Sequence, residues 1–316
     1  MARRWDILAT VSTPGILAVN LGPVRLKNPV MTASGTCGYG HDVQPAGLNA
    51  SLGAICTKGL SLEPRQGNPP PRIWETPAGM LNAIGLANMG VEAFLADVLP
   101  LLEQAGVTVI ANIFADSMED FGRLAARLAK AGGIAALELN VSCPNVKQGG
   151  IHFGRDPDRA AELTAHVSER SGLPIIVKMT PEAPDIAAVA RACEQAGACA
   201  LSAINTIRGM AVDVERARPR LATVYGGLSG PALKPIALRI VHELSKQVSI
   251  PIVGIGGISS AEDALEFLMA GASAVQVGTA TFLDPQAPFQ VLAGLETWCT
   301  EHETTIRKVI GSMEEP

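Results

Sequence analysis

The chain has 316 residues, of which 47% are hydrophobic and 17% charged, and its formal net charge is −5 at pH 7. This composition supports a large buried core and excludes disordered and fibrous classes, and the length suits one α/β barrel or two smaller domains. An acidic balance without a basic block lacks the electrostatic footprint of nucleic-acid binding, so we expect a small-molecule ligand.

The N-terminal segment MARRWDILATVSTPG begins with Arg3 and Arg4, as the first part of a signal peptide does. Asp6, Thr10 and Pro14 then interrupt any apolar core that would follow, so we expect no signal peptide. No apolar run reaches the roughly 18 residues that predict a membrane span, and no membrane association is expected.

A β-hairpin is predicted at about residues 16–28, in LAVNLGPVRLKNP, where it would cap the lower end of a barrel. From residue 30 onward, short runs rich in Val and Ile alternate with longer segments of helical period. Eight candidate strands result: 29–33, 54–58, 107–113, 136–142, 174–180, 199–205, 251–257 and 274–279.

The segments between these strands have helical periodicity. In GVEAFLADVLPLLEQAG the apolar residues recur at three- and four-residue spacing, as a helix buried on one face requires. Several such segments end at a glycine, which is typical of helix C-termini: Gly106, Gly172, Gly197 and Gly271.

Strands that are apolar on both faces and joined by helices indicate a parallel sheet, and eight such units predict a closed (β/α)8 TIM barrel. An open doubly wound sheet is the alternative. We predict one domain over residues 1–316, with the barrel at about 29–300. Two long segments, 59–87 and 206–230, exceed ordinary βα loops and are interpreted as active-site lids or binding loops.

Polar residues close five of the apolar runs: Lys58, Asn112, Asn140, Lys178 and Asn205. In a parallel barrel the C-terminal ends of the strands share one rim, where active sites lie. Any one asparagine could equally cap a helix or bond to a turn. The set of five favours a site, because lysine is a poor helix cap and is costly to bury without a partner.

Glycine-rich turns follow the last two predicted strands, in VGIGGISS (253–260) and VQVGTATF (275–282). Such turns can direct backbone N–H groups toward a phosphate, although each could also be a tight βα loop. The motif GGLSG (226–230) adds a third turn of this kind. Together they predict a phosphorylated ligand across the barrel mouth.

FMN fits this ligand better than a nicotinamide dinucleotide. No GxGxxG motif follows the first strand, and the nearest glycine cluster, ASGTCGYG (33–40), has different spacing. A flavin ring accepts hydride at N5, and a lysine near N1 stabilises the negative charge of its reduced form. Lys178 is the candidate for that lysine.

The cysteines show no CxxC pair and no spacing suited to zinc or to an iron–sulfur cluster, so we predict no metal site and interpret them as reduced thiols of a cytoplasmic protein. There are six: Cys37, Cys56, Cys143, Cys193, Cys199 and Cys299.

Taken together, these motifs closely resemble the class 1 dihydroorotate dehydrogenases of the NAD-linked subclass B type. The resemblance extends from about residue 20 to 285, in the stretches NPVMTASGTCGYG, GNPPPRIWETPAGMLNAIGLAN, ELNVSCPNVKQGG, PIIVKM, INTIRGM, GGLSGPALKPIAL, PIVGIGGI and AGASAVQVGTA. It implies oxidation of (S)-dihydroorotate to orotate on one FMN per chain, in the de novo biosynthesis of UMP.

The resemblance implies that Cys143 is the catalytic base, removing a proton from C5 of dihydroorotate while hydride leaves C6 for the flavin. A thiolate with a lowered pKa suits this role. A buried, inert thiol is the alternative for any cysteine in a barrel, and we prefer it for Cys193 and Cys199. Ser142, next to the proposed base, has no assigned role.

The resemblance also implies two sets of binding residues. Asparagine amides suit the alternating donors and acceptors of a pyrimidine ring, and lysine suits its carboxylate. The substrate set is Lys58, Asn82, Ala83, Ile84, Gly85, Leu86, Asn140, Asn145, Asn205 and Thr206. The cofactor set is Ser34, Lys58, Gly59, Asn112, Asn140, Lys178, Ile204, Gly230, Gly256, Gly257, Gly278 and Thr279.

The subclass follows from CPNVKQGG and the HFG after it, which resemble the NAD-linked form. Membrane-bound class 2 relatives carry an N-terminal helical extension and a serine base, unlike this chain. The NAD-linked form implies a partner electron-transfer subunit that carries FAD and a [2Fe–2S] cluster. Two catalytic and two electron-transfer subunits would form a heterotetramer that passes electrons to NAD.

Three alternatives stay open at this point. A fumarate-linked class 1 enzyme, or a flavin barrel like that of dihydropyrimidine dehydrogenase, would share most of these motifs. A phosphate-binding barrel that serves only as a non-catalytic subunit belongs to a different functional class. Bleaching of a bound flavin by dihydroorotate distinguishes an active dihydroorotate dehydrogenase from the last two.

Overall fold

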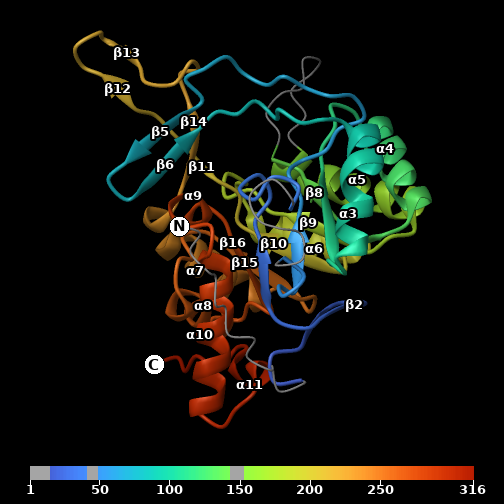
Figure 1. The fold of residues 1–316 in the computed structure, drawn as a ribbon, viewed down its shortest axis with the longest axis vertical. Coiled ribbons are helices and arrows are strands. Elements are labelled where there is room, and N and C mark those ends of the chain that lie inside the picture. The colour runs from blue at the N-terminus through green and yellow to red at the C-terminus, as the bar shows by residue number, and fades with distance from the viewer. Residues whose placement is uncertain (1–14, 41–48, 143–152) are drawn as a thin grey trace, which may run out of the picture.

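The computed structural model describes residues 15–40, 49–142 and 153–316, and a closed parallel barrel forms its centre (Figure 1). The strands follow the order β10-β15-β16-β3-β4-β7-β8-β9 around the barrel. Their bounds are β3 Val30–Thr32, β4 Ala54–Cys56, β7 Val109–Ile113, β8 Ile134–Asn140, β9 Ile175–Lys178, β10 Ala200–Ala203, β15 Ile252–Ile255 and β16 Ala274–Val277. All eight predicted strands are therefore confirmed, and the open sheet is excluded.

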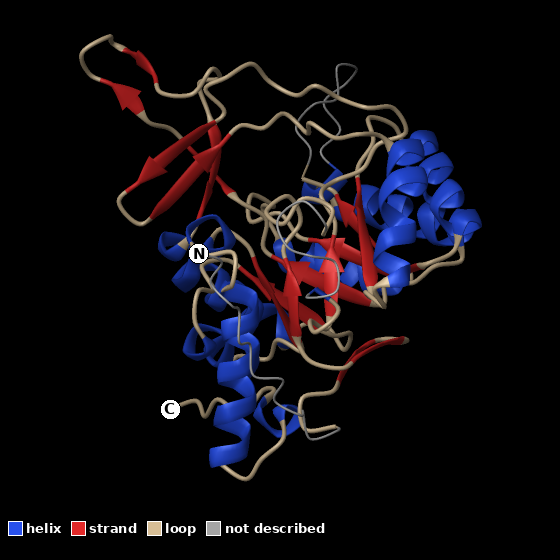
Figure 2. Cartoon of the chain, viewed as in Figure 1, coloured by secondary structure: helices blue, strands red, loops and turns tan. Residues whose placement is uncertain are grey.

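Helices cover the outside of the barrel (Figures 1 and 2). Their bounds are α2 Val91–Ala93, α3 Leu99–Gln104, α4 Met118–Ala131, α5 Pro157–Ser171, α6 Ile186–Gln195, α7 Lys234–Ser245, α8 Ala261–Met269, α9 Ala280–Leu283, α10 Ala287–Glu301 and α11 Ile306–Val309. A π-helical segment, Phe94–Val98, joins α2 to α3, and two 3-10 turns span Phe153–Arg155 and Pro231–Leu233.

Local sequence explains where these helices begin and end. The hydroxyl of Ser117 accepts a hydrogen bond from the Asp120 N–H and caps α4, which buries Phe121 and Leu124 against the barrel. The predicted glycine stops are confirmed, as at Gly172, where φ is 63° after the last residue of α5.

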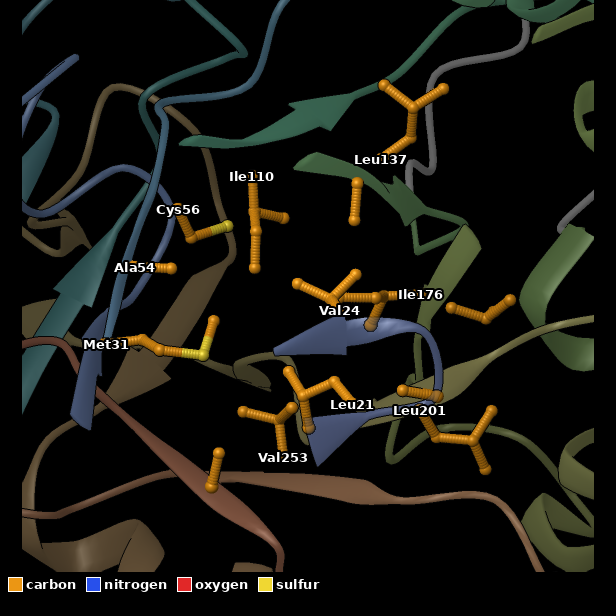
Figure 3. Packing of buried hydrophobic residues seen from close by; sticks show 14 of the residues in the cluster. Leu21, Val24, Met31, Ala54, Cys56, Ile110, Leu137, Ile176, Leu201 and Val253 are labelled. Atoms are coloured by element: carbon orange, nitrogen blue, oxygen red, sulfur yellow. The ribbon is translucent and has the colours of Figure 1, made fainter. Parts of the chain in front are cut away.

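The predicted N-terminal hairpin is confirmed as β1 Val19–Leu21 paired antiparallel with β2 Val24–Leu26. Leu21 and Leu26 are fully buried. In Figure 3 the side chains of Leu21 and Val24 point in among apolar side chains of the barrel strands. The hairpin thus supplies apolar side chains to the barrel core.

The turn of the hairpin lies against the start of a barrel strand. A Cβ atom at Gly22 would lie 2.9 Å from the Cβ of Cys199, the residue directly before β10. This contact places the hairpin at the N-terminal end of the barrel, opposite the expected active-site rim, as the sequence predicted.

Outside the barrel, the two long segments form regular structure that the sequence interpretation missed. The strands β5 Ile73–Thr76, β6 Gly79–Asn82, β11 Ile207–Gly209 and β14 Gly226–Ser229 make an antiparallel sheet in the order β11-β14-β6-β5. A small hairpin of β12 Val212–Asp213 and β13 Arg218–Pro219 extends beyond this sheet (Figures 1 and 2). These segments are therefore not irregular loops.

The physical reason for this difference is that the strands are short and partly exposed. β5 lacks the alternation of buried and exposed residues that identifies a strand, since three of its four residues are exposed. The hairpin of β5 and β6 joins the rest of the sheet through a distant part of the chain, since Leu81 of β6 pairs with Leu228 of β14. Local periodicity contains no information on such a pairing.

None of the helices in the described ranges combines the length and apolar character needed to cross a membrane.

Candidate active site

A cavity of about 830 Å³ opens at the C-terminal ends of the barrel strands, beneath the outer sheet. Every described residue of the two predicted sets lines it. From the barrel these are Ser34, Lys58, Gly59, Asn112, Asn140, Lys178, Ile204, Asn205, Thr206, Gly256, Gly257, Gly278 and Thr279. From the segments that carry the outer sheet they are Asn82, Ala83, Ile84, Gly85, Leu86 and Gly230. The structure brings these residues together, and their individual roles stay predictions.

Two predicted residues, Cys143 and Asn145, lie outside the described residues. The described chain reaches Ser142, which lines the cavity immediately before Cys143. The Ser142 hydroxyl oxygen is buried and has no hydrogen-bond partner among the described residues. Ser142 is thus a cavity residue that the sequence left without a role.

Lys178 ends β9 with its side chain almost completely buried, at 6% exposure. Its ammonium donates a hydrogen bond to the Ser34 hydroxyl at 3.0 Å, and Nζ lies 3.6 Å from Oε1 of Glu138. A buried lysine needs such polar partners to keep its charge. The pairing joins a predicted cofactor residue to a carboxylate that the sequence interpretation overlooked.

Glu138 lies on β8, two residues before Asn140, and is fully buried. Residues two apart on a strand share a face, so both side chains point into the barrel. A charged residue within the apolar run ALELN, on the same face as a predicted ligand, is the signal that could have identified it. No comparably clear signal marked the charged residues that line the cavity but were not predicted, which are Arg155, Glu182 and Arg208.

The predicted substrate amides form a connected group. The Asn205 side-chain amide donates to Oδ1 of Asn140 at 3.1 Å, and Oδ1 of Asn205 accepts from the Thr206 N–H at 2.8 Å. On the opposite wall, the Asn82 amide donates to the Gly227 carbonyl at 3.2 Å. These bonds fix the orientation of the amides, as recognition of a polar ring requires.

The three glycine turns also meet. The hydroxyl of Thr279 donates to that of Ser229 at 2.8 Å, which links the turn after β16 to the GGLSG turn. Gly257, with φ of 75°, lies so close to the GGLSG turn that a Cβ there would be 3.0 Å from the Gly230 carbonyl oxygen. Only a residue without a side chain suits this approach. The three turns therefore lie together along the cavity, where we expect backbone N–H groups to bind a phosphate.

The charge balance of the cavity favours an anionic ligand. Its described lining includes four cationic side chains, those of Lys58, Arg155, Lys178 and Arg208, and one carboxylate, that of Glu182. Among the described residues, no group of three or more His, Cys, Asp and Glu side chains is placed to hold a metal ion.

Two cysteines that we interpreted as inert, Cys193 and Cys199, have raised pKa values. Burial raises the pKa of Cys193 to about 11 and that of Cys199 to about 11. Thiols with such pKa values stay protonated and weakly nucleophilic near neutral pH. These pKa values agree with the interpretation of both thiols as inert, but only Cys193 is fully buried, whereas Cys199 is partly exposed.

Comparison with known proteins shows what family this site belongs to. The family model described as dihydroorotate dehydrogenase matches residues 16–298, nearly the whole chain. The chain belongs to the dihydroorotate dehydrogenase family. The resemblance inferred from the sequence motifs is thereby confirmed.

Relatives within the dihydroorotate dehydrogenase family support the assignment. A protein of Geotalea daltonii is 51% identical over 94% of this chain and 98% of its own length. A protein of Trichlorobacter lovleyi is 52% identical over 94% of this chain and 98% of its own length. A protein of Maridesulfovibrio salexigens is 54% identical over 87% of this chain and 90% of its own length. Each of the three is named dihydroorotate dehydrogenase B (NAD(+)), catalytic subunit.

Membership of the dihydroorotate dehydrogenase family implies a flavin cofactor, and the cavity residues fit one. A flavin needs an anion site for its phosphate, polar groups along its ring and a cation near the pyrimidine end of the ring. The glycine turns, the amides and Lys178 provide these in one cavity. The alternative of a phosphate-binding barrel that serves only as a non-catalytic subunit is not favoured.

Proposed function

We propose that this chain is the catalytic subunit of an NAD-linked dihydroorotate dehydrogenase, which oxidises (S)-dihydroorotate to orotate in the de novo biosynthesis of UMP. The observation that carries the proposal is the convergence of every described residue of both predicted sets on one cavity, in a chain of this family. The names of the relatives favour this activity over the fumarate-linked and dihydropyrimidine dehydrogenase-like alternatives.

The flavin is proposed to be FMN. The turns at Gly230, Gly257 and Thr279 lie close together, so they would form a single anion site that suits a single terminal phosphate. Bound FMN would supply a ring that accepts hydride at N5. Lys178, held by Ser34, would place its charge where the reduced ring becomes negative.

The substrate is proposed to lie between the barrel rim and the segment 82–86. Lys58 would pair with the carboxylate of dihydroorotate, and Asn82, Asn140, Asn205 and Thr206 would bind the ring amides, with Asn145 as a further ligand. Asn140 and Lys58 would contact both ligands.

Cys143 is proposed to remove the proton from C5. In the sequence it directly follows Ser142, which lies at the cavity wall. A base in this role must lie within hydrogen-bond reach of the proton that it removes. The roles of Cys143 and Asn145 rest on the family resemblance alone.

A partner is proposed on the basis of the names of the relatives, which specify both a catalytic subunit and NAD(+). We propose an electron-transfer subunit with FAD and a [2Fe–2S] cluster, in a heterotetramer of two catalytic and two electron-transfer subunits in the cytoplasm. Co-purification from the native cell should yield a second flavin and an iron–sulfur spectrum.

We also propose that residues 1–316 form one domain.

The activity itself is tested by adding dihydroorotate to the purified yellow protein without oxygen. The flavin absorbance should bleach, and Cys143→Ser should slow this step. A protein that stays yellow would contradict the proposed activity, and a colourless protein would contradict flavin binding.

A further inference from the structure

Glu138 is the centre of a buried hydrogen-bond network that connects most of the barrel. Its Oε1 accepts from Nδ2 of Asn112 at 2.7 Å and from the Cys56 thiol at 3.2 Å, and lies 3.6 Å from Nζ of Lys178. Its Oε2 accepts from Ser202 at 2.8 Å and from Gln276 at 2.8 Å. These partners come from five different barrel strands.

This network contacts the cavity through two of its members. Lys178 and Asn112 both line the cavity, whereas Glu138 lies below them in the core. Because the Asn112 amide nitrogen donates to Glu138, its oxygen is turned the other way, toward Gly59, where a Cβ would lie 3.1 Å from it. The carboxylate thus orients one predicted cofactor ligand and pairs with another.

The carboxylate of Glu138 is ionised. Burial alone would raise its pKa, but Lys178 and the hydrogen bonds from Gln276, Ser202 and Asn112 outweigh burial and hold the pKa below its ordinary value. Four hydrogen-bond donors and one ammonium occupy the lone pairs of its two oxygens. A negative charge therefore lies directly behind the positive charge of Lys178.

We propose that Glu138 is a positioning residue for the flavin site, and that its negative charge limits how strongly Lys178 attracts electron density onto the bound ring. This inference rests on the proposed flavin site and goes beyond it, since Glu138 does not line the cavity. Because the carboxylate lies directly behind the ammonium, its charge partly offsets the attraction that Lys178 exerts on negative charge in the ring.

A purely structural role is the competing explanation, because a buried acid with so many partners also holds strands together. The two explanations differ in their effect on the flavin. A structural role changes stability alone. A positioning role changes the affinity of the ring for negative charge, which reversible addition of sulfite at flavin N5 reports independently of enzyme activity.

The experiment compares Glu138→Gln, which removes the charge at nearly constant shape, with Gln276→Met, which removes one hydrogen bond and leaves the charge. The probe is inorganic sulfite, titrated into the flavin-bound protein at pH 6.5 and followed by flavin absorbance. We expect Glu138→Gln to bind sulfite about tenfold more tightly than wild type, the scale on which one buried charge affects a neighbour. The sulfite affinity of Gln276→Met should stay within about twofold of that of wild type.

A second pair of variants keeps the proposal testable where Glu138→Gln does not fold. Lys178→Met leaves the carboxylate of Glu138 without its ion-pair partner. The double variant Lys178→Met with Glu138→Gln removes both charges, and proteins often tolerate the loss of a whole buried ion pair better than the loss of one partner. The double variant should bind sulfite about tenfold more tightly than Lys178→Met. The role of Glu138 would be overturned if Glu138→Gln bound sulfite as wild type does and the double variant bound it as Lys178→Met does. Bleaching by dihydroorotate would still support the proposed function in that case.

Discussion

The side-chain amide of Asn205 donates to Oδ1 of Asn140 at 3.1 Å, which joins the rim residues that follow β10 and end β8. Asn140 is proposed to contact both flavin and substrate, whereas Asn205 is proposed to contact substrate alone. The two asparagines should therefore differ in what they lose on substitution.

Asn205→Ala should raise the KM for dihydroorotate by roughly 10- to 100-fold, because an unpaired polar group costs about 1–3 kcal/mol, and should leave flavin content unchanged. Asn140→Ala should lower both flavin content and kcat/KM. Steady-state kinetics and flavin absorbance per chain measure the two effects. Loss of flavin from Asn205→Ala would contradict this division.

Because the glycine turns lie so close together, we expect flavin binding to be sensitive to substitution of Gly257. A Cβ there would lie 2.8 Å from the Cβ of Lys234 and would push the phosphate turns apart, so Gly257→Ala should weaken flavin binding at least about tenfold. Gly311→Ala is the matched control, since its φ of 70° is similar and nothing lies within 4 Å of its Cβ position. Flavin release measured by fluorescence should separate the two, and equal retention would contradict the phosphate assignment.

Eight strands and the rim residues at their ends were predictable because a parallel barrel buries both strand faces, so its strands are mostly apolar and end in polar side chains. The outer sheet was not, since β5 is exposed and its sheet is assembled from segments distant in the chain. Glu138 was missed for a similar reason. Its partners come from five other strands, and no local pattern reveals that they meet.

The N-terminal hairpin predicts a stability effect remote from the site. Leu21 is fully buried against the barrel, so Leu21→Ala should lower the free energy of unfolding by about 2–5 kcal/mol. Leu283 is 85% exposed and serves as the control. Leu283→Ala should change the free energy of unfolding by less than about 0.5 kcal/mol. Chemical denaturation of both variants measures this. Similar stabilities would contradict the contribution of the hairpin to the core.

Asp263 predicts a pH-dependent contribution to stability. It forms a capping box with Ser260 at the start of α8 and accepts from Nζ of Lys234 at 2.7 Å. Burial raises its pKa, but Lys234 and Ser259 more than offset this, and the pKa lies below its usual value. A lowered pKa stabilises the fold above the unfolded pKa, and this contribution disappears as pH falls through the folded value.

Asp263→Asn should therefore be less stable than wild type by about 1 kcal/mol at pH 7, and the difference should shrink below about pH 4. Thermal unfolding at several pH values follows the trend. A difference that stays constant down to pH 3 would show that the charge of Asp263 contributes nothing.

This chain is proposed to oxidise dihydroorotate on a flavin bound in the cavity. The most direct test of this activity is a single anaerobic turnover, in which the flavin-bound chain alone is mixed with excess dihydroorotate and orotate is quantified. We expect one orotate per bound flavin, formed as the flavin bleaches, and a lower rate in Cys143→Ser. Bleaching without orotate, or orotate formation at an equal rate in Cys143→Ser, would contradict this proposal.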